Sequence, residues 1–226
     1  MNIYVIIPAY NEEQSIGKVV EAIPQGLVKE VVVVSNASTD NTMNVATQAG
    51  ATAIEERQKG YGAACLKGIR YIADKGDADI IVFLDGDFSD YPEEMPLLIK
   101  PIIEGGYDMV IGSRALGERE GGSMMPQQIF GNWLATTLIR LLYKYEFTDL
   151  GPFRAIRYDK LVEINMKDED FGWTVEMQVK AAKLKMKCTE VAVNYRKRIG
   201  VSKVTGTIKG TFMAGYKILW TIFKFL

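Results

Sequence analysis

Four short apolar runs, separated by helical patterns, most constrain how this chain of 226 residues can fold. They cover residues 3–8, 29–34, 53–55 and 80–84, and three of them consist largely of isoleucine and valine. Runs of this length and composition, bounded by turn residues, are typical of strands buried on both faces. Strands that alternate with helices predict a doubly wound, mostly parallel central sheet flanked by helices, with right-handed crossovers. The expected fold class is therefore α/β.

The segments between and after these runs predict the other elements. Ile16, Val19, Val20 and Ile23 recur at helical spacing, with Asn11 as the expected cap and Gln14 in the capping-box position. Asp40 is placed to cap the next helix. Further strands are expected at 108–111, 153–157 and 188–195, and further helices at 60–72, 92–104, 126–145, 174–185 and 207–226. The turn after the first strand lacks Gly-x-Gly-x-x-Gly, which excludes a dinucleotide-binding fold.

The composition of the chain argues against several kinds of catalysis, cross-link and partner. The chain has no histidine, which excludes His-based acid–base catalysis and His-ligated zinc. Its two cysteines are widely spaced, which predicts a reduced, cytoplasmic protein rather than a disulfide framework. The net charge of −1 gives no indication of a nucleic-acid partner. The sequence starts directly with a strand pattern, without a signal peptide, and no run reaches the ~20 apolar residues that span a bilayer.

Two carboxylates, Asp85 and Asp87, directly follow the fourth apolar run. Ligands of open α/β sheets bind outside the carboxyl ends of the strands, so both side chains are expected at a binding site. Hard carboxylate oxygens suit Mg²⁺ or Mn²⁺ held on a diphosphate. A lone Asp-x-Asp is also found in ordinary strand-to-helix turns, and the prediction therefore depends on the motifs around it.

Six motifs occur in a fixed order, and together they carry a resemblance. They are Pro8-Ala-Tyr-Asn-Glu-Glu13, Ser38-Thr-Asp40, Lys59-Gly-Tyr-Gly-Ala-Ala64, Asp85-Gly-Asp87, Gly112-Ser-Arg114 and Asp149-Leu-Gly-Pro-Phe-Arg154. With them the chain resembles the family 2 glycosyltransferases, which have the nucleotide-diphospho-sugar transferase fold known as GT-A. The basic run Arg196–Lys203 is similar to that of the branch containing dolichyl-phosphate mannose synthase and the polyprenyl-phosphate glucosyltransferases. The resemblance covers residues 3 to about 215.

The resemblance implies three groups of site residues. Contacts with the nucleotide-sugar are implied for Pro8, Ala9, Tyr10, Glu12, Ser35, Asn36, Gly62, Asp85, Gly86, Asp87 and Arg114. Metal ligation is implied for Asp85, Asp87 and Ser89, and binding of phosphate or acceptor for Arg154, Arg196, Lys197, Arg198 and Lys203. Catalysis is assigned to Asp87, with Asp149 and Glu176 as candidate bases for an alcohol acceptor. Glu176 is explained as well by an ordinary helix-surface acid, and Lys197 by a solvated charge.

One position departs from the family. Relatives usually carry an acidic pair where this chain has Ser35-Asn36, and a carboxylate there helps to read the nucleotide base. A neutral Asn36 still offers hydrogen bonds to a base edge, but without the charge-assisted bond. This change leaves the donor open and keeps a non-catalytic nucleotide-sugar-binding protein as one alternative.

The end of the chain has a different charge balance from the rest. No acid follows Glu190, whereas seven lysines and arginines do, which predicts an anionic partner for this end. In the predicted last helix Lys209, Lys217 and Lys224 share one arc, opposite an apolar side containing Ile218 and Ile222. Such a helix either lies in a membrane interface or packs on protein. The predicted division is a GT-A domain over 1–205, with halves 1–114 and 115–205, and a C-terminal amphipathic helix over 206–226.

These patterns and the resemblance together predict an inverting, metal-dependent glycosyltransferase at the cytosolic face of a membrane. The expected donor is a nucleotide-diphospho-sugar, UDP-glucose before GDP-mannose, and the expected cofactor is Mg²⁺ or Mn²⁺. The expected acceptor is a polyprenyl or dolichyl phosphate, and a soluble sugar or other alcohol is the alternative. A homo-oligomer is compatible with the sequence.

Overall fold

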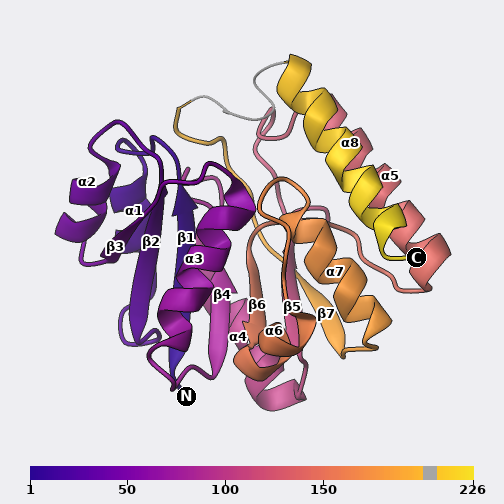
Figure 1. Ribbon diagram of the computed structural model, residues 1–226, viewed down its shortest axis with the longest axis horizontal. Helices are drawn as coiled ribbons and strands as arrows, with labels where there is room; N and C mark the ends of the chain where they lie inside the picture. The colour runs from indigo at the N-terminus through magenta and orange to yellow at the C-terminus, as the bar shows by residue number, and fades with distance from the viewer. Residues whose placement is uncertain (201–207) are drawn as a thin grey trace.

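The computed structural model of the protein describes residues 1–200 and 208–226. A seven-stranded sheet runs through its centre in the order β3-β2-β1-β4-β6-β5-β7 (Figure 1). Strand β6 is antiparallel to both of its neighbours, and the other neighbouring strands are parallel. The strands are β1 Ile3–Ala9, β2 Glu30–Asn36, β3 Thr52–Glu56, β4 Ile80–Phe83, β5 Met109–Ser113, β6 Arg154–Arg157 and β7 Cys188–Ala192. The predicted mostly parallel α/β sheet is confirmed.

Helices cover both faces of this sheet, and each side has its own apolar core. One core includes residues of α1 (Ile16–Ala22), α2 (Thr42–Gln48) and α4 (Met95–Gly105), which follows the 3₁₀ turn Pro92–Glu94. The other includes residues of α3 (Tyr61–Ala73), α5 (Pro126–Tyr143), α6 (Tyr158–Ile164) and α7 (Trp173–Lys183). Successive residues of β1 alternate between the two, since Tyr4 and Ile6 join the second core and Val5 and Ile7 the first.

The last helix, α8 (Ile208–Lys224), packs on α5 and α7 at one flank of the molecule (Figure 1). Ile222 is fully buried there, and the Tyr143 hydroxyl donates a hydrogen bond to its carbonyl. Lys217, predicted to share one arc with the other lysines of this helix, forms an ion pair of 3.0 Å with Asp168. Among the described helices, none is long and apolar enough to cross a bilayer.

Three local predictions were wrong. Helix α1 begins at Ile16, and Asn11 lies outside it with a φ of 53°, where its side-chain oxygen accepts a bond from the Thr39 N–H. Helix α6 was not predicted, because its seven residues carry too short a pattern. Helix α5 ends at Tyr143, two residues before its predicted end, and its Ala135 and Ile139 face the core while Trp133 and Leu141 are exposed.

Candidate active site

A cavity of about 490 Å³ opens at the carboxyl ends of β1, β2 and β4. Because the three strands are parallel neighbours, their last residues meet at one edge, which places Ala9, Asn36 and Asp85 around the same space. The loop before α7 and the segment after β7 close the far side. The lining consists of Pro8, Ala9, Tyr10, Glu12, Asn36, Lys59, Gly60, Tyr61, Ala64, Asp85, Gly86, Asp87, Arg114, Gln128, Asp170, Phe171, Tyr195 and Arg198.

Asp85 lines this cavity, and one of its carboxylate oxygens is unsatisfied. Its Oδ1 is buried and has no hydrogen-bond partner within residues 1–200 and 208–226. Burial, with a smaller effect of the Asp87 charge, raises the pKa of Asp85 to about 7. A buried acceptor without a partner is energetically costly, so the site favours a cation or a donor at this oxygen.

Asp87 is held by the chain on both oxygens. Its Oδ1 accepts bonds from the N–H and the hydroxyl of Ser89, at 2.9 and 2.5 Å. Its Oδ2 lies 2.9 Å from Nη2 of Arg198, and the same nitrogen lies 3.6 Å from Oε1 of Glu12. The Ser89 hydroxyl is fully buried and directed at Asp87, so Ser89 orients a carboxylate and is not among the lining residues. This contact argues against the prediction that Ser89 is a third metal ligand.

The carboxylates of Asp85 and Asp87 fit a divalent cation that is shared with a diphosphate. Both line the cavity, and both offer the hard oxygens that Mg²⁺ and Mn²⁺ prefer. No three Asp, Glu or Cys side chains converge on a metal position in the described part of the chain. The protein therefore offers two carboxylates, and a bound diphosphate would have to supply further ligands.

The opposite end of the cavity is formed by Tyr10, Asn36 and Lys59. The ammonium of Lys59 lies 5.5 Å from the centre of the Tyr10 ring, a cation–π contact. Asn36 uses its amide internally: its Nδ2 donates to the Gln58 carbonyl at 2.6 Å, and its Oδ1 accepts from the Gly60 N–H at 2.8 Å. The Asn36 side chain therefore fixes the turn that carries Lys59, which sequence reasoning had not shown.

Two glycines at the start of α3 let a distant loop approach. A Cβ on Gly60 would lie 2.1 Å from the Glu169 carbonyl oxygen, and one on Gly62 would lie 2.0 Å from that of Asp168. The close contact brings Asp170 and Phe171 to the cavity. Gly62 does not line the cavity and neither does the buried Ser35, and their contact with the nucleotide-sugar stays a prediction.

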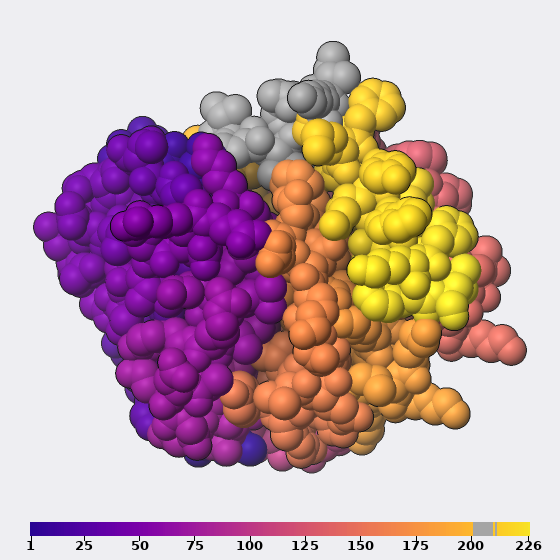
Figure 2. Space-filling view, in the orientation of Figure 1, coloured from indigo at the N-terminus to yellow at the C-terminus, as the bar shows by residue number. Residues whose placement is uncertain are grey.

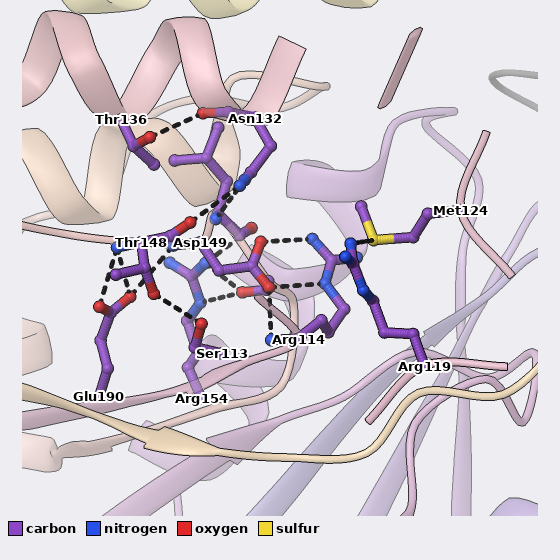
Figure 3. Close-up of polar contacts among 12 residues, drawn as sticks. Ser113, Arg114, Arg119, Met124, Asn132, Thr136, Thr148, Asp149, Arg154 and Glu190 are labelled. Atoms are coloured by element: carbon purple, nitrogen blue, oxygen red, sulfur yellow. Dashed lines mark hydrogen bonds and ion pairs between the residues drawn. The ribbon is translucent and has the colours of Figure 1, made fainter. Parts of the chain in front are cut away.

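Arg114 and Asp149 form a bidentate ion pair beside the cavity (Figure 3). The Nε and Nη2 of Arg114 lie 2.8 and 2.7 Å from the two carboxylate oxygens, and its backbone N–H donates to Oδ2. Burial alone would raise the pKa of Asp149, but the charge and hydrogen bonds of Arg114 hold it below its usual value. Asp149 is only 1% exposed and both its oxygens are occupied, which argues against its predicted role as a base.

Two other predicted site residues have structural roles. The guanidinium of Arg154 is fully buried and donates to the carbonyls of Leu150, Gly151 and Thr174. Burial lowers the pKa of Arg154 to about 10. Glu176 is 1% exposed, accepts the N–H groups of Lys167 and Asp168, and pairs with Lys180 at 2.5 Å. Neither side chain lines the cavity, and the buried contacts of both argue against their predicted roles in phosphate binding and catalysis.

The basic run after β7 is only partly at the site. Arg198 lines the cavity, as expected. Arg196 is stacked on the rings of Phe88 and Tyr91, 3.6 and 4.1 Å from their centres, and donates to two carbonyls, so its predicted contact with phosphate is not supported. The exposed Lys197 lies outside the lining, and Lys203 lies outside the described residues.

Several lining residues were not predicted. Lys59 and Tyr61 belong to the motif Lys59-Gly-Tyr-Gly-Ala-Ala64, which is a local signal from which both could have been predicted. Gln128, Asp170 and Tyr195 reach the cavity from three separate segments, and nothing in their local sequence marks them. Burial raises the pKa of Tyr195 to about 12.

The arrangement is that of a GT-A transferase, and comparison with known proteins agrees. Solved structures of glucosyl-3-phosphoglycerate synthase from Mycobacterium tuberculosis share the fold, one of them in complex with Mn²⁺, UDP and glucosyl-3-phosphoglycerate. Its TM-score is 0.78 at 21% identity, over 99% of this chain and 79% of that one.

The family model "Glycosyl transferase family 2" matches residues 4–164. The chain belongs to this family and is a hexosyltransferase. An uncharacterized glycosyltransferase of M. tuberculosis is 31% identical over 93% of both chains. An undecaprenyl-phosphate mannosyltransferase of Micrococcus luteus is 30% identical over 93% of this chain and 90% of its own length.

Proposed function

We propose that this enzyme is an inverting, metal-dependent transferase that moves a hexose from a nucleotide-diphospho-sugar to a polyprenyl phosphate. The observation that carries the donor half is the Asp85–Asp87 pair: both residues line the cavity, and one buried carboxylate oxygen of Asp85 has no hydrogen-bond partner in the described part of the chain. A divalent cation bound there supplies Lewis-acid stabilisation of the departing diphosphate. The Mn²⁺ and UDP in structures of the same fold support this choice. UDP-glucose remains the first donor proposed and GDP-mannose the second.

The acceptor proposed here is one that needs no general base. Asp149 and Glu176 are engaged in buried ion pairs outside the cavity. A phosphate nucleophile is already ionised near neutral pH, its second pKa being about 6, and needs no general base. One of its oxygens forms a bond to the anomeric carbon while the bond from that carbon to the diphosphate breaks, and the nucleoside diphosphate leaves with the electron pair. The residues of the cavity then only orient and screen the reacting charges.

An aromatic surface supports an acceptor held at a membrane. Exposed side chains follow one another along α8, where Phe212 is 75%, Tyr216 69% and Trp220 54% exposed. Helix α5 runs beside α8 and adds Phe130 and Trp133, whose rings are 5.8 Å apart. Figure 2 shows α8 uncovered along this flank. Helices that expose aromatic side chains in this way bind membrane interfaces, and relatives named for undecaprenyl or dolichyl phosphate agree with such an acceptor.

Transfer to a soluble alcohol is the second candidate, because Asp170 lines the cavity. Burial, and then the charge of Asp168, raises the pKa of Asp170, a change that favours a general base. A solved relative by fold is named for a soluble acceptor, phosphoglycerate.

One assay separates the two candidates. The purified enzyme is incubated with radiolabelled UDP- and GDP-hexoses, Mg²⁺ or Mn²⁺, and either a polyprenyl phosphate or a panel of soluble alcohols. Label in the organic phase supports the polyprenyl phosphate, and label on a water-soluble product supports the alcohol. Hydrolysis of donor without transfer to either acceptor class would contradict both.

A further inference from the structure

A second cavity, of about 410 Å³, lies between α5 and the segment before Leu150. It is separated from the active-site cavity by the Arg114–Asp149 pair, since Arg114 lines the first cavity and Asp149 the second (Figure 3). No residue lines both cavities, so the second one is a site of its own.

Hydrogen bonds within the protein hold part of the wall of this second cavity in place. Asn132 of α5 donates to the Thr148 carbonyl at 2.9 Å and accepts the Leu150 N–H at 2.8 Å. The hydroxyls of Ser113 and Thr148 are 2.6 Å apart, and Glu190 accepts the Thr148 N–H. These bonds are satisfied within the protein, so the cavity keeps its shape without a ligand.

Two guanidinium groups at this cavity are available for a ligand. Arg119 and Arg140 line it, both are exposed, and no carboxylate pairs with either of them within the described chain. The guanidinium of Arg119 donates to the sulfur of Met124, at 3.6 Å. The charge of Asp149 is neutralised by Arg114, so the exposed Glu146 is the remaining acid against these two cations. Guanidinium groups favour phosphate, which they bind with several hydrogen bonds.

The rest of the lining is apolar and leads outward. Ile129 and Trp133 line the cavity and are 44% and 58% exposed. Trp133 also contacts the ring of Phe130, which is 60% exposed and lies on the aromatic surface of α5 and α8. An anion bound at the arginines can therefore carry an apolar chain that continues along this surface.

We propose that the second cavity binds a phosphate monoester carried on an apolar chain, with Arg119 and Arg140 on the phosphate and Trp133 and Ile129 against the chain. This inference rests on the proposed function, because it makes the cavity the entry site of the acceptor. The Arg114–Asp149 pair then lies between the bound phosphate and the donor. The phosphate has to pass this pair to reach the sugar.

The test is calorimetric binding without donor or metal, so it is independent of sugar transfer. Farnesyl phosphate is the probe, and farnesol and inorganic phosphate are the comparison ligands. We expect both comparison ligands to bind at least about tenfold more weakly than the probe, since each keeps only half of the contacts. The double variant Arg119→Gln/Arg140→Gln is expected to lose at least about tenfold in affinity for farnesyl phosphate. Arg57→Gln, at a side chain 88% exposed and unrelated to the cavity, is the matched control.

A second variant and a vesicle-binding measurement distinguish this proposal from its alternatives. Trp133→Ser is expected to weaken farnesyl phosphate but not inorganic phosphate, and unchanged thermal unfolding shows that each variant is folded. Unchanged affinity in the double variant would overturn the proposal. The proposal would also be overturned if the double variant lost only its binding to phosphatidylglycerol vesicles, because the arginines would then bind lipid headgroups. Farnesyl phosphate that binds through the arginines but accepts no sugar would leave this site standing and refute the proposed function.

Discussion

The Nη2 of Arg198 lies 2.9 Å from Oδ2 of Asp87, so a cation of the chain itself occupies one of the two carboxylates proposed to hold the metal. The bond joins the segment after β7 to the turn after β4, and the Ile199 N–H reinforces it by donating to the Asp87 carbonyl at 2.9 Å. A divalent cation and Arg198 would therefore compete for Oδ2 of Asp87.

Removing the guanidinium of Arg198 should make the binding of Mn²⁺ tighter, because the two cations compete for Asp87. Arg198→Gln is expected to bind Mn²⁺ about fivefold more tightly in the absence of nucleotide, corresponding to about 1 kcal/mol for a partly exposed ion pair. Binding is measured by electron paramagnetic resonance of free Mn²⁺. Arg157→Gln, an arginine paired with Asp159 away from the cavity, is the control. Weaker Mn²⁺ binding in Arg198→Gln would contradict the competition.

Loss of the Asp87 carboxylate itself should strongly reduce turnover. Asp87→Asn is expected to reduce transfer by about 10²–10³-fold, the range found when one electrostatic contact to the transition state is removed. Transfer of labelled hexose is measured over a Mn²⁺ titration. Asp74→Asn, on the exposed end of α3, serves as the control. Full activity of Asp87→Asn would rule out this carboxylate as a metal ligand, and activity that survives chelation of all divalent cations would rule out the metal.

Gly62 should matter for stability more than for binding. Gly62→Ala places a methyl group 2.0 Å from the Asp168 carbonyl oxygen, a backbone atom that can move only with its loop. We expect a loss of about 1–3 kcal/mol in the free energy of unfolding, which lowers Tm by about 2–4 °C per kcal/mol. Gly131→Ala is the matched control, because no atom lies within 4 Å of its Cβ position in α5. Equal Tm values in the two variants would show that the loop yields easily.

Two acids of the α7 region should separate the candidate acceptors. Glu176→Gln is expected to change turnover less than about twofold and to lower Tm, because Lys180 loses its buried partner. Asp170→Asn is expected to lower transfer to an alcohol by about 10²–10⁴-fold, the contribution of a general base, and to leave transfer to a phosphate nearly unchanged. Rates are compared as kcat for each acceptor class. A large loss with both acceptors in Asp170→Asn would assign the residue to donor binding instead.

The aromatic surface can be tested apart from catalysis. Tyr216→Ser/Trp220→Ser is expected to reduce sedimentation with anionic vesicles at least tenfold, since each buried aromatic side chain contributes roughly 1.5–3 kcal/mol. Leu97→Ser, an equally apolar change at a 47% exposed residue of α4, is the control. Unchanged sedimentation would show that α8 serves only to pack on α5 and α7.

The sequence by itself determined the sheet and where its ligands would be. Short β-branched runs predicted β1, β2 and β4, and parallel strands necessarily bring Ala9, Asn36 and Asp85 to one edge. The order of the motifs indicated the family, which the family model confirms. These inferences succeed because strand and helix periodicity are local, repeating every 2 and 3.6 residues.

Only the tertiary structure decided which partner each charged group has. Arg114 was predicted to contact the nucleotide-sugar and Arg198 to bind phosphate or acceptor, yet one is paired with Asp149 and the other with Asp87. Glu176 was predicted as a candidate base, but its oxygens contact Lys180 and accept the N–H groups of Lys167 and Asp168. Buried charges must find compensating groups, and those groups come from segments up to 111 residues apart, as in the Asp87–Arg198 pair. Local sequence patterns do not encode such pairings, because they are fixed only when the packed sheet brings distant loops together.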